Sequence, residues 1–408
     1  MKTTRVVGGM LALASALLAP SQSDAESWPC FRGPNHDGVS TETDWTHDWP
    51  TSGPSIAWSA QVGTGYSSVV IDAGRLVTMG NEENVDTVHC LDAATGETVW
   101  QHSYSSPTDP NEFSGGPTST PTIHDGRVYT LSRTGEAFCF DAATGEVQWS
   151  VNVAVEAQVR VPGWGFSGAP WVDDRLVVLN VGDAGVGLDR ATGKVLWASA
   201  DKDAGYSSFV PSQHGETPTL VFGSARSYVC INPETGAELW RQRWLTTFGC
   251  NAADPIVLKN QVFLSSGYNR GSALLETGDD SPAVVWKHKE FQNQISTSVK
   301  VGDYLYGASG DIAQGAKLTC MNFLTGDIAW IEPSIHVGGL LASGERLIVL
   351  SDEGELLVVA ASAESPDLLA RHAVLSGQSW TAPVLSDQRL FCRASDGQLV
   401  CLDLSESK

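Results

Sequence analysis

Residues 90–100 read CLDAATGETVW, and residues 139–149 repeat this phrase almost letter for letter as CFDAATGEVQW. Three further copies end at Trp197, Trp240 and Trp330. In every copy an Asp or Asn stands eight residues before the tryptophan, and a Thr-Gly pair begins three residues after that Asp or Asn. A phrase that recurs along a chain indicates a fold built from one small unit in series.

The interval between the copies indicates which unit is repeated. Weaker copies that end at Trp58 and Trp286 complete a series in which neighbouring tryptophans are 42 to 49 residues apart. The tryptophans of this series are Trp58, Trp100, Trp149, Trp197, Trp240, Trp286 and Trp330. A period of roughly 40–50 residues is typical of a β-propeller blade.

Between the copies, apolar runs alternate with polar turns, as in PTIHDGRVYTLS at residues 121–132. Each unit reads as four short strands, and no long stretch after residue 25 has a helical apolar period. We expect an all-β protein, an eight-bladed β-propeller of four-stranded blades, with seven blades as the alternative. The last blade would combine a strand around Trp58 with the strands that follow Trp380, so that N- and C-terminal strands close the ring.

The repeated phrase also predicts its own structural role. The glycine of each Thr-Gly pair suits a turn with positive φ, and the Asp or Asn before it can accept hydrogen bonds from amides of the same turn. The tryptophan has a flat face that can pack against the neighbouring blade, and burying an indole contributes about 2–4 kcal/mol. We expect these seven tryptophans to dock adjacent blades on one another.

The net charge of the chain and its first 25 residues limit the possible partners and the cellular location of the protein. The net charge is −22, and no run of Lys or Arg occurs, which argues against nucleic acid or an anionic membrane surface as a partner. Residues 1–25 resemble a signal peptide, with Lys2 and Arg5 before a short apolar run and small residues at 23–25. This run is too short to span a membrane, and no lipid-attachment cysteine follows it. We expect a periplasmic or secreted monomer whose mature chain has no transmembrane segment.

The domain boundaries follow from the repeat. Residues 26–53 precede it as an extended arm, and residues 54–408 form the propeller. The arm contains WPCFRGPNHDGVS at residues 28–40, where turn residues predominate. We expect Trp28 and Phe31 to pack on the outside of the propeller, and we expect no metal site at residues 35–37.

The eight cysteines do not read as a disulfide framework. Five of them stand two residues before the Asp or Asn of a repeat, which indicates small buried side chains. One pair is a candidate disulfide, because a two-residue turn at residues 396–397 would place Cys392 opposite Cys401. Cys30 and Cys250 have no partner that the sequence identifies.

No catalytic motif stands out, so no catalytic residue and no cofactor is predicted. The GxGxxG at residues 163–168 leads into a strand and not a helix, which argues against dinucleotide binding. The loops that enter each inner strand surround one mouth of the channel, where aromatic rings and a few donors suit a planar ligand, a sugar or a peptide. The candidates for ligand or partner binding there are Tyr66, Arg160, Trp164, Tyr206, Phe248, Asn251 and Trp380. Filling of the core at the strand ends is the alternative role for each of them.

The Asp-x-x-Thr-Gly-x-x-x-Trp phrase resembles the tryptophan-docking repeat of the PQQ-like β-propeller family, where PQQ is pyrroloquinoline quinone. Its five clear copies make the resemblance specific for the fold, and it covers residues 54–408. The strip at residues 28–40 is similar to one that opens many exported bacterial members. The resemblance implies a propeller.

Two branches of this family imply different functions. The quinoprotein dehydrogenases hold PQQ and calcium in the channel, use an Asp base and, in the alcohol-oxidising members, place a disulfide of adjacent cysteines against the cofactor. This chain is shorter and has no adjacent cysteines, so no catalytic residue carries over. The BamB-like branch is non-enzymatic and serves outer-membrane assembly, although BamB is a lipoprotein and the lipid-attachment cysteine is missing here. We therefore expect a BamB-like scaffold that binds a protein or polymer partner in the cell envelope. The alternatives are a PQQ- and calcium-dependent oxidoreductase and a carbohydrate-binding propeller.

Overall fold

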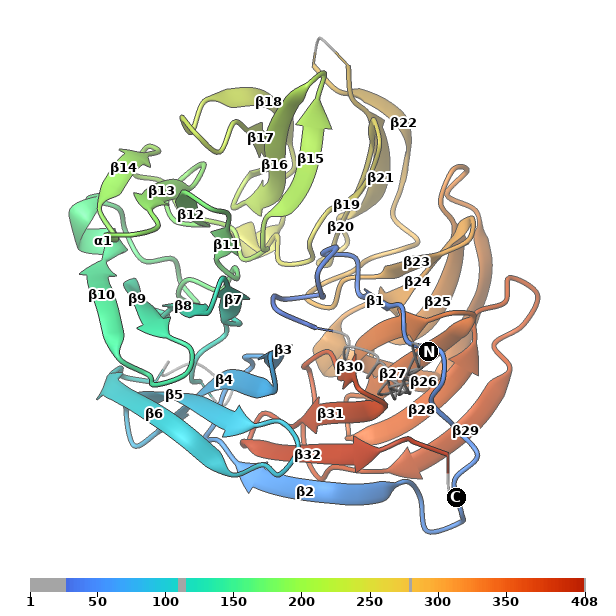
Figure 1. Ribbon diagram of the computed structural model, residues 1–408. Coiled ribbons are helices and arrows are strands. Elements are labelled where there is room, and N and C mark those ends of the chain that lie inside the picture. The colour runs from blue at the N-terminus through green and yellow to red at the C-terminus, as the bar shows by residue number, and fades with distance from the viewer. Residues whose placement is uncertain (1–26, 109–114, 279–280, 407–408) are drawn as a thin grey trace, which may run out of the picture.

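The computed structural model describes residues 27–108, 115–278 and 281–406. The predicted signal peptide, residues 1–25, lies outside the described residues. The described strands form antiparallel sheets that stand in a ring around a central channel (Figure 1). The chain is therefore an all-β protein with the architecture of a β-propeller.

Six sheets of the described chain have four strands each. The first is β3 (Val70–Asp72), β4 (Arg75–Glu82), β5 (Val85–Asp92) and β6 (Thr98–Ser105). The second is β7 (Thr122–His124), β8 (Arg127–Leu131), β9 (Glu136–Asp141) and β10 (Val147–Asn152). The third is β11 (Trp171–Val172), β12 (Leu176–Leu179), β13 (Val186–Asp189) and β14 (Val195–Ala198).

The next two sheets follow the same order along the chain. One is β15 (Val210–His214), β16 (Thr217–Ser224), β17 (Ser227–Ile231) and β18 (Glu238–Arg243). The other is β19 (Ile256–Leu258), β20 (Gln261–Ser266), β21 (Gly271–Glu276) and β22 (Ala283–His288). Three short helical segments are α1 (Val153–Glu156), η1 (Thr247–Gly249) and η2 (Ile312–Gln314). No helix in the described part of the chain is long and apolar enough to cross a membrane.

One larger sheet has eight strands because the long β26 (Ile328–Ser343) belongs to two four-stranded sets. Its first half pairs with β25, and its second half pairs with β27. The set before it contains β23 (Val299–Val301), β24 (Tyr304–Ser309) and β25 (Lys317–Asn322). The set after it contains β27 (Arg346–Ser351), β28 (Glu355–Ala360) and β29 (Leu368–Ala373). The short β1 (Val39–Ser40) pairs in parallel with the second half of β26.

The remaining sheet joins the two ends of the propeller. β2 (Ser55–Gln61) lies beside β32 (Gln398–Asp403), which continues through β31 (Arg389–Arg393) to β30 (Val384–Ser386). Trp58 of β2 is paired with Cys401 of β32. N- and C-terminal strands thus lie in one sheet, as the sequence predicts.

The repeated phrase forms the joint between neighbouring sheets. The Nε1–H of Trp100 donates to the carbonyl of Ala142 in the next sheet at 2.9 Å. The same bond runs from Trp58, Trp149, Trp197, Trp286 and Trp330 to a carbonyl of the following sheet. Within each turn the Asp or Asn accepts main-chain amides, as Asp141 does from Ala143 and Thr144 at 3.0 and 2.9 Å.

The N-terminal arm lies across the channel (Figure 1). Trp28 and Ile71 of β3 exchange two main-chain hydrogen bonds, each 2.8 Å long, and the carbonyl of Pro29 accepts the N–H of Ile123 at 2.7 Å. The prediction that Trp28 and Phe31 pack on the outside is therefore wrong. The inner strands present main-chain donors and acceptors to the channel, and the arm satisfies those of Ile71 and Ile123.

The predicted pairing of Cys392 with Cys401 is also wrong. Cys392 lies opposite Val400, whereas Cys401 lies opposite Phe391, so the two thiols occupy opposite faces of the sheet, and both are free. The loop is wider than a two-residue turn, because the pairing of β31 and β32 ends at Arg393 and Leu399. A register shift of one residue moves a side chain to the other face.

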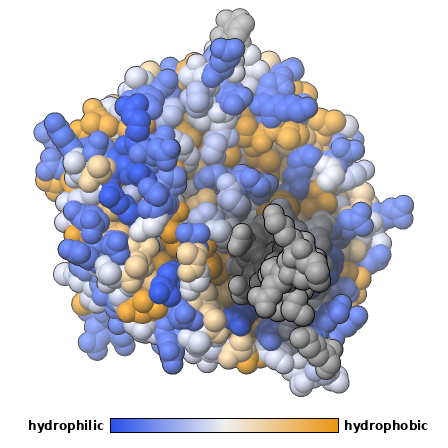
Figure 2. Space-filling model, viewed as in Figure 1, coloured by the Kyte–Doolittle hydropathy of each residue, from blue (hydrophilic) through white to orange (hydrophobic). Residues whose placement is uncertain are grey.

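The face seen in Figure 2 is mostly hydrophilic, with separate hydrophobic groups among the polar residues. Exposed apolar residues occur on outer strands, among them Leu196, Val284 and Val285, which are 50%, 50% and 51% exposed. The outer strands form the rim of the propeller, and one side of each faces solvent. Val284 and Val285 are consecutive, and both are exposed at the bulge between Val284 and Trp286.

Candidate ligand-binding site in the channel

A cavity of about 260 Å³ lies where the chain enters the inner strands. Loops before β3, β7, β11, β15, β19, β23 and β30 contribute to its wall. The aromatic residues that line it are Phe31, Tyr66, Trp164, Tyr206, Tyr268 and Trp380. Its charged residues are Arg32, Arg133 and Asp254. Phe31 and Arg32 come from the arm, so the segment that crosses the channel also forms part of the cavity wall.

Two aromatic rings stand together where the first and last units meet. Tyr66 stacks on Trp380 with ring centroids 5.9 Å apart and an angle of 24° between the planes. The hydroxyl of Tyr66 donates to Oε1 of Gln378 at 2.9 Å, which fixes the orientation of the phenol. Both rings are half-buried and line the cavity, so they present a flat apolar wall to it.

A second aromatic group lies on another part of the wall. Trp164 packs edge to face against Tyr206 with centroids 5.6 Å apart. Phe248 contacts both Trp164 and Tyr268, at centroid distances of 5.9 and 5.7 Å. Phe248 itself is 70% exposed and has a φ of +64°, so it lies at the rim and outside the lining of the cavity.

Asp254 is the only carboxylate that lines the cavity among the described residues. It is 5% exposed, and its Oδ1 accepts the main-chain N–H of Ser208 at 2.7 Å. Burial raises the pKa of Asp254 from 3.8 to about 6, against the opposing effects of Arg32 and of the Ser208 N–H. A carboxyl group with such a pKa is partly protonated near neutral pH and can act as donor or acceptor.

Arg32 brings a buried guanidinium into the channel from the arm. Its Nη1 donates to the carbonyl of Thr297 at 3.2 Å, and its Nη2 donates to the carbonyls of Ser298 and Asp37 at 2.8 and 2.7 Å. Burial lowers the pKa of Arg32, while the charges of Asp254 and Asp37 raise it. These bonds tie the arm to the loop that enters β23.

Four of the seven predicted mouth residues line this cavity, namely Tyr66, Trp164, Tyr206 and Trp380. Arg160 lies apart, in exposed ion pairs with Asp201 and Asp203 at 3.3 and 3.6 Å. The structure thus brings the aromatic candidates together and leaves this cation outside.

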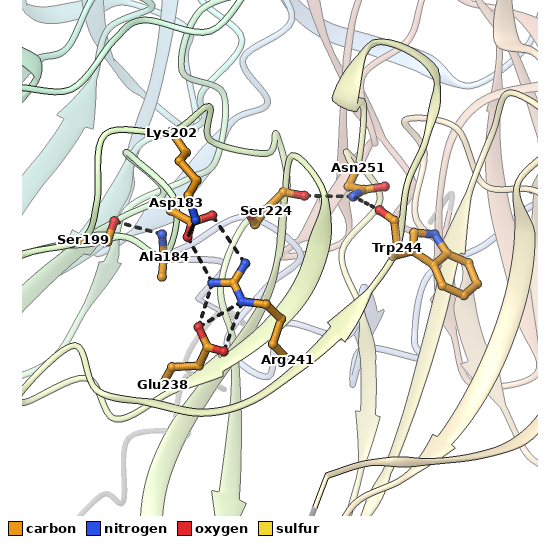
Figure 3. Close-up of polar contacts among 9 residues, drawn as sticks. All are labelled: Asp183, Ala184, Ser199, Lys202, Ser224, Glu238, Arg241, Trp244 and Asn251. Carbon is orange, nitrogen blue, oxygen red and sulfur yellow. Dashed lines mark hydrogen bonds and ion pairs between the residues drawn. The ribbon is translucent and has the colours of Figure 1, made fainter.

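Asn251 has a structural role instead of lining the cavity. It is fully buried, and its Nδ2 donates to the carbonyls of Ser224 and Trp244 at 2.8 and 3.1 Å (Figure 3). Figure 3 also shows Arg241 between Glu238 and Asp183, with shortest ion-pair distances of 2.7 and 3.4 Å. Asn251 thus joins Ser224 of β16 to Trp244, which follows β18, and Arg241 of β18 pairs with Asp183 of the preceding unit. None of these residues lines the cavity.

Sequence reasoning missed Asp254, although the repeat carries a signal for it. Position 254 lies two residues before β19, and the other units have small residues at the same distance from their first strand. The equivalent residues are Ser68, Thr120, Ala169, Ser208, Thr297 and Ala382. A single carboxylate among serine, threonine and alanine marks the site. Arg32 and Phe31 were missed because the arm has no equivalent elsewhere in the repeat.

The chain matches a family model described as outer membrane protein assembly factor BamB over residues 84–332. BamB from Moraxella catarrhalis has a similar structure, with a TM-score of 0.63 and 16% identity, over 86% of this chain and 99% of that chain. Quinohemoprotein alcohol dehydrogenase from Comamonas testosteroni is similar with a TM-score of 0.66 and 14% identity, over 94% of this chain and 81% of that one. A europium-containing methanol dehydrogenase is similar with a TM-score of 0.67 and 13% identity, over 92% and 89% of the two chains. No curated protein sequence matches. Since the family model spans more than half of the sequence, this chain belongs to the BamB family of PQQ-like β-propellers.

Proposed function

We propose that this protein is an exported, non-enzymatic binding protein that holds a partner of the cell envelope at the mouth of its channel. The observation that carries the proposal is the aromatic cavity, whose wall is completed by the chain's own N-terminal arm. Aromatic side chains give large contact areas at low entropic cost, and they are enriched where proteins bind ligands and one another. A periplasmic or secreted monomer with a protein or polymer partner fits this arrangement and the family.

We also infer eight blades. The two halves of β26 pair with different neighbours, so the eight-stranded sheet counts as two four-stranded units. With the six separate sheets this supports the eight-bladed arrangement that the repeat predicts.

The second candidate function is a PQQ-dependent oxidoreductase. Asp254 favours it, because a buried carboxylate with a pKa of about 6 is suited to general base catalysis. The rest of the donor set fits PQQ and calcium poorly. Among residues 27–108, 115–278 and 281–406, no three His, Cys, Asp or Glu side chains are grouped to hold a metal ion. The volume of the cavity, about 260 Å³, is also below the roughly 300–1,000 Å³ that is typical of sites for drug-sized ligands.

Titration of the mature protein with PQQ and calcium separates the two functions. We expect no saturable quenching of tryptophan fluorescence at micromolar PQQ, and no dye-coupled oxidation of alcohols or sugars. Saturable binding with turnover, abolished by Asp254→Asn, would establish the oxidoreductase instead.

A position-specific crosslink tests the binding role directly. A photoreactive residue at Phe248, which is 70% exposed at the rim, is expected to capture a defined partner in native envelopes. The same residue at Leu196, which is 50% exposed on an outer strand, provides the control. Equal labelling from both positions, or none from position 248, contradicts a partner at the channel mouth.

A further inference from the structure

Four hydrogen bonds link equivalent positions of neighbouring units around the channel. The main-chain N–H of Ser68 donates to Oγ1 of Thr120 at 3.0 Å, and that of Ala169 donates to Oγ of Ser208 at 3.1 Å. The N–H of Asp254 likewise donates to Oγ1 of Thr297 at 2.8 Å. A hydroxyl oxygen is therefore the usual acceptor at this position.

Asp254 accepts the equivalent bond from Ser208 with one oxygen of its carboxylate, at 2.7 Å. Serine or threonine supplies the acceptor in the other three bonds, and Ala169 and Ala382 supply none, so the second oxygen of Asp254 is not needed for these bonds. The charge of Asp254 also favours the charged form of the buried Arg32. Burying this carboxylate is costly, as the raised pKa of Asp254 shows. A group that costs stability and lines a cavity is best explained by a ligand that uses it.

The charges around the cavity favour an uncharged ligand. A cationic ligand beside Asp254 would meet the positive charges of Arg32 and Arg133. An anionic ligand would meet Asp254, and the Arg32 guanidinium already donates to main-chain carbonyls of the arm and of the loop before β23. The Nε of Arg133 donates to the carbonyl of Trp164 at 3.3 Å. Hydroxyl groups are the polar groups that suit such surroundings, since they donate to a carboxylate without bringing charge.

The aromatic walls determine the rest of the ligand's shape. Tyr66 with Trp380 and Trp164 with Tyr206 form two separate aromatic surfaces at the cavity. The C–H faces of a sugar ring pack on such surfaces while its hydroxyl groups remain at the edge of the ring for hydrogen bonds. The volume of about 260 Å³ suits one such ring, and a second ring would lie toward the mouth of the channel.

We propose that the channel cavity binds a neutral sugar ring, stacked on the aromatic walls and donating a hydroxyl to the carboxylate of Asp254. The inference rests on the proposed binding function and names the chemistry of its ligand. The same ring chemistry is present in a free monosaccharide and at the end of a polysaccharide chain, and the experiment distinguishes these sources.

Calorimetry and tryptophan fluorescence test it on the full mature protein. The probes are D-glucose, D-galactose, D-mannose and N-acetylglucosamine, the disaccharides maltose and cellobiose, and the charged analogues glucosamine and glucuronate. Each is added to about 10 mM, ten times a weak Kd of 1 mM. We expect saturable binding of at least one neutral sugar and at least about tenfold weaker binding of its charged analogue. A disaccharide that binds tenfold more tightly than its monosaccharide assigns the chain end as the source.

Two variants and a control connect binding to the residues. Asp254→Ser restores the residue type of the other units and keeps the acceptor for Ser208, and we expect it to fold and to bind the sugar at least about tenfold more weakly. Trp380→Ala removes one stacking surface and is expected to do the same. Trp171→Ala changes a half-buried indole outside the cavity and should leave sugar affinity unchanged. Thermal unfolding checks that all three are folded.

Either of two results overturns the inference. Failure of every neutral sugar to bind at 10 mM, while the crosslink at position 248 persists, removes the sugar and leaves the proposed binding function intact. Unchanged affinity in Asp254→Ser and Trp380→Ala places any sugar site elsewhere on the protein.

Discussion

The indole of Trp100 lies directly on Gly145 of the next sheet, where a Cβ would stand 2.6 Å from the ring. Gly145 also has a φ of +73°, so this position favours glycine for two reasons, the positive φ and the closeness of the indole. The same arrangement recurs between Trp58 and Gly96 and between Trp149 and Gly193. The repeated Thr-Gly therefore reflects both the turn and the indole packed on it.

Replacing this glycine should destabilise the protein more than its turn alone explains. We expect Gly145→Ala to lower the free energy of unfolding by about 3–5 kcal/mol, through backbone strain and overlap with the indole. Gly126→Ala is the matched control, because Gly126 has a φ of +68° and no atom near its Cβ position, so about 1–2 kcal/mol is expected. Urea unfolding of both variants measures the difference. Equal losses of stability in the two variants would show that the indole moves aside with no cost in free energy.

Removing Arg32 should loosen the arm. We expect Arg32→Met to lower the free energy of unfolding by about 2–4 kcal/mol, because several buried carbonyls lose a charged donor. Limited proteolysis should then cut within residues 27–40. Arg175→Met is the control, since the Arg175 side chain is 74% exposed and its pairing with Glu234 contributes little. An arm that stays resistant in Arg32→Met would mean that its main-chain pairing suffices.

Asp254 predicts a distinct pH dependence of stability. Its pKa is about 6 in the folded protein and 3.8 unfolded, so the folded state binds the proton more tightly. Its contribution to stability is therefore fully present below about pH 4 and is lost as the pH rises to about 6, a change of about 3 kcal/mol. Unfolding free energies measured from pH 4 to 7 should show this decline in the native protein and not in Asp254→Asn. Parallel profiles would mean that Asp254 ionises normally.

The thiols should be protected in the folded protein. All eight cysteines are buried and free, and burial raises the pKa of Cys401 and of Cys30 to about 12. We expect almost no reaction with a thiol reagent in native buffer and eight reactive groups after unfolding without reductant. A count of six after unfolding would reveal a disulfide that the register of Cys392 and Cys401 excludes.

The sequence predicts the features of this fold that depend on local spacing. The interval between tryptophans such as Trp100 and Trp149 predicts the repeating sheets, and the strand around Trp58 predicts their closure with β32. The register of Cys392 could not be predicted, because Ala394 bonds back to Gln398 across a loop wider than the Asp396-Gly397 pair suggests.

The candidate site could be predicted only in part. Tyr66 and Trp164 stand in loops whose position follows from the repeat, so their place at the channel was foreseeable. The position of the arm was not foreseeable, because Arg32 and Trp28 are held by main-chain groups more than forty residues away. Main-chain groups carry no signal in the sequence. Asp254 was overlooked because its importance lies in its difference from equivalent residues, and not in any motif.

The pairing of β2 with β32 has a consequence for how the chain reaches its native state. The first strand of the propeller finds its neighbour only in β32, at the opposite end of the repeat. Until these two strands pair, one sheet lacks its rim strand, and the ring has two unprotected edges that can capture other chains. Loss of β32 would therefore leave an open ring of sheets, because β2 would have no partner strand. Closure of the ring therefore requires both β2 and β32, and their pairing protects the two edges together.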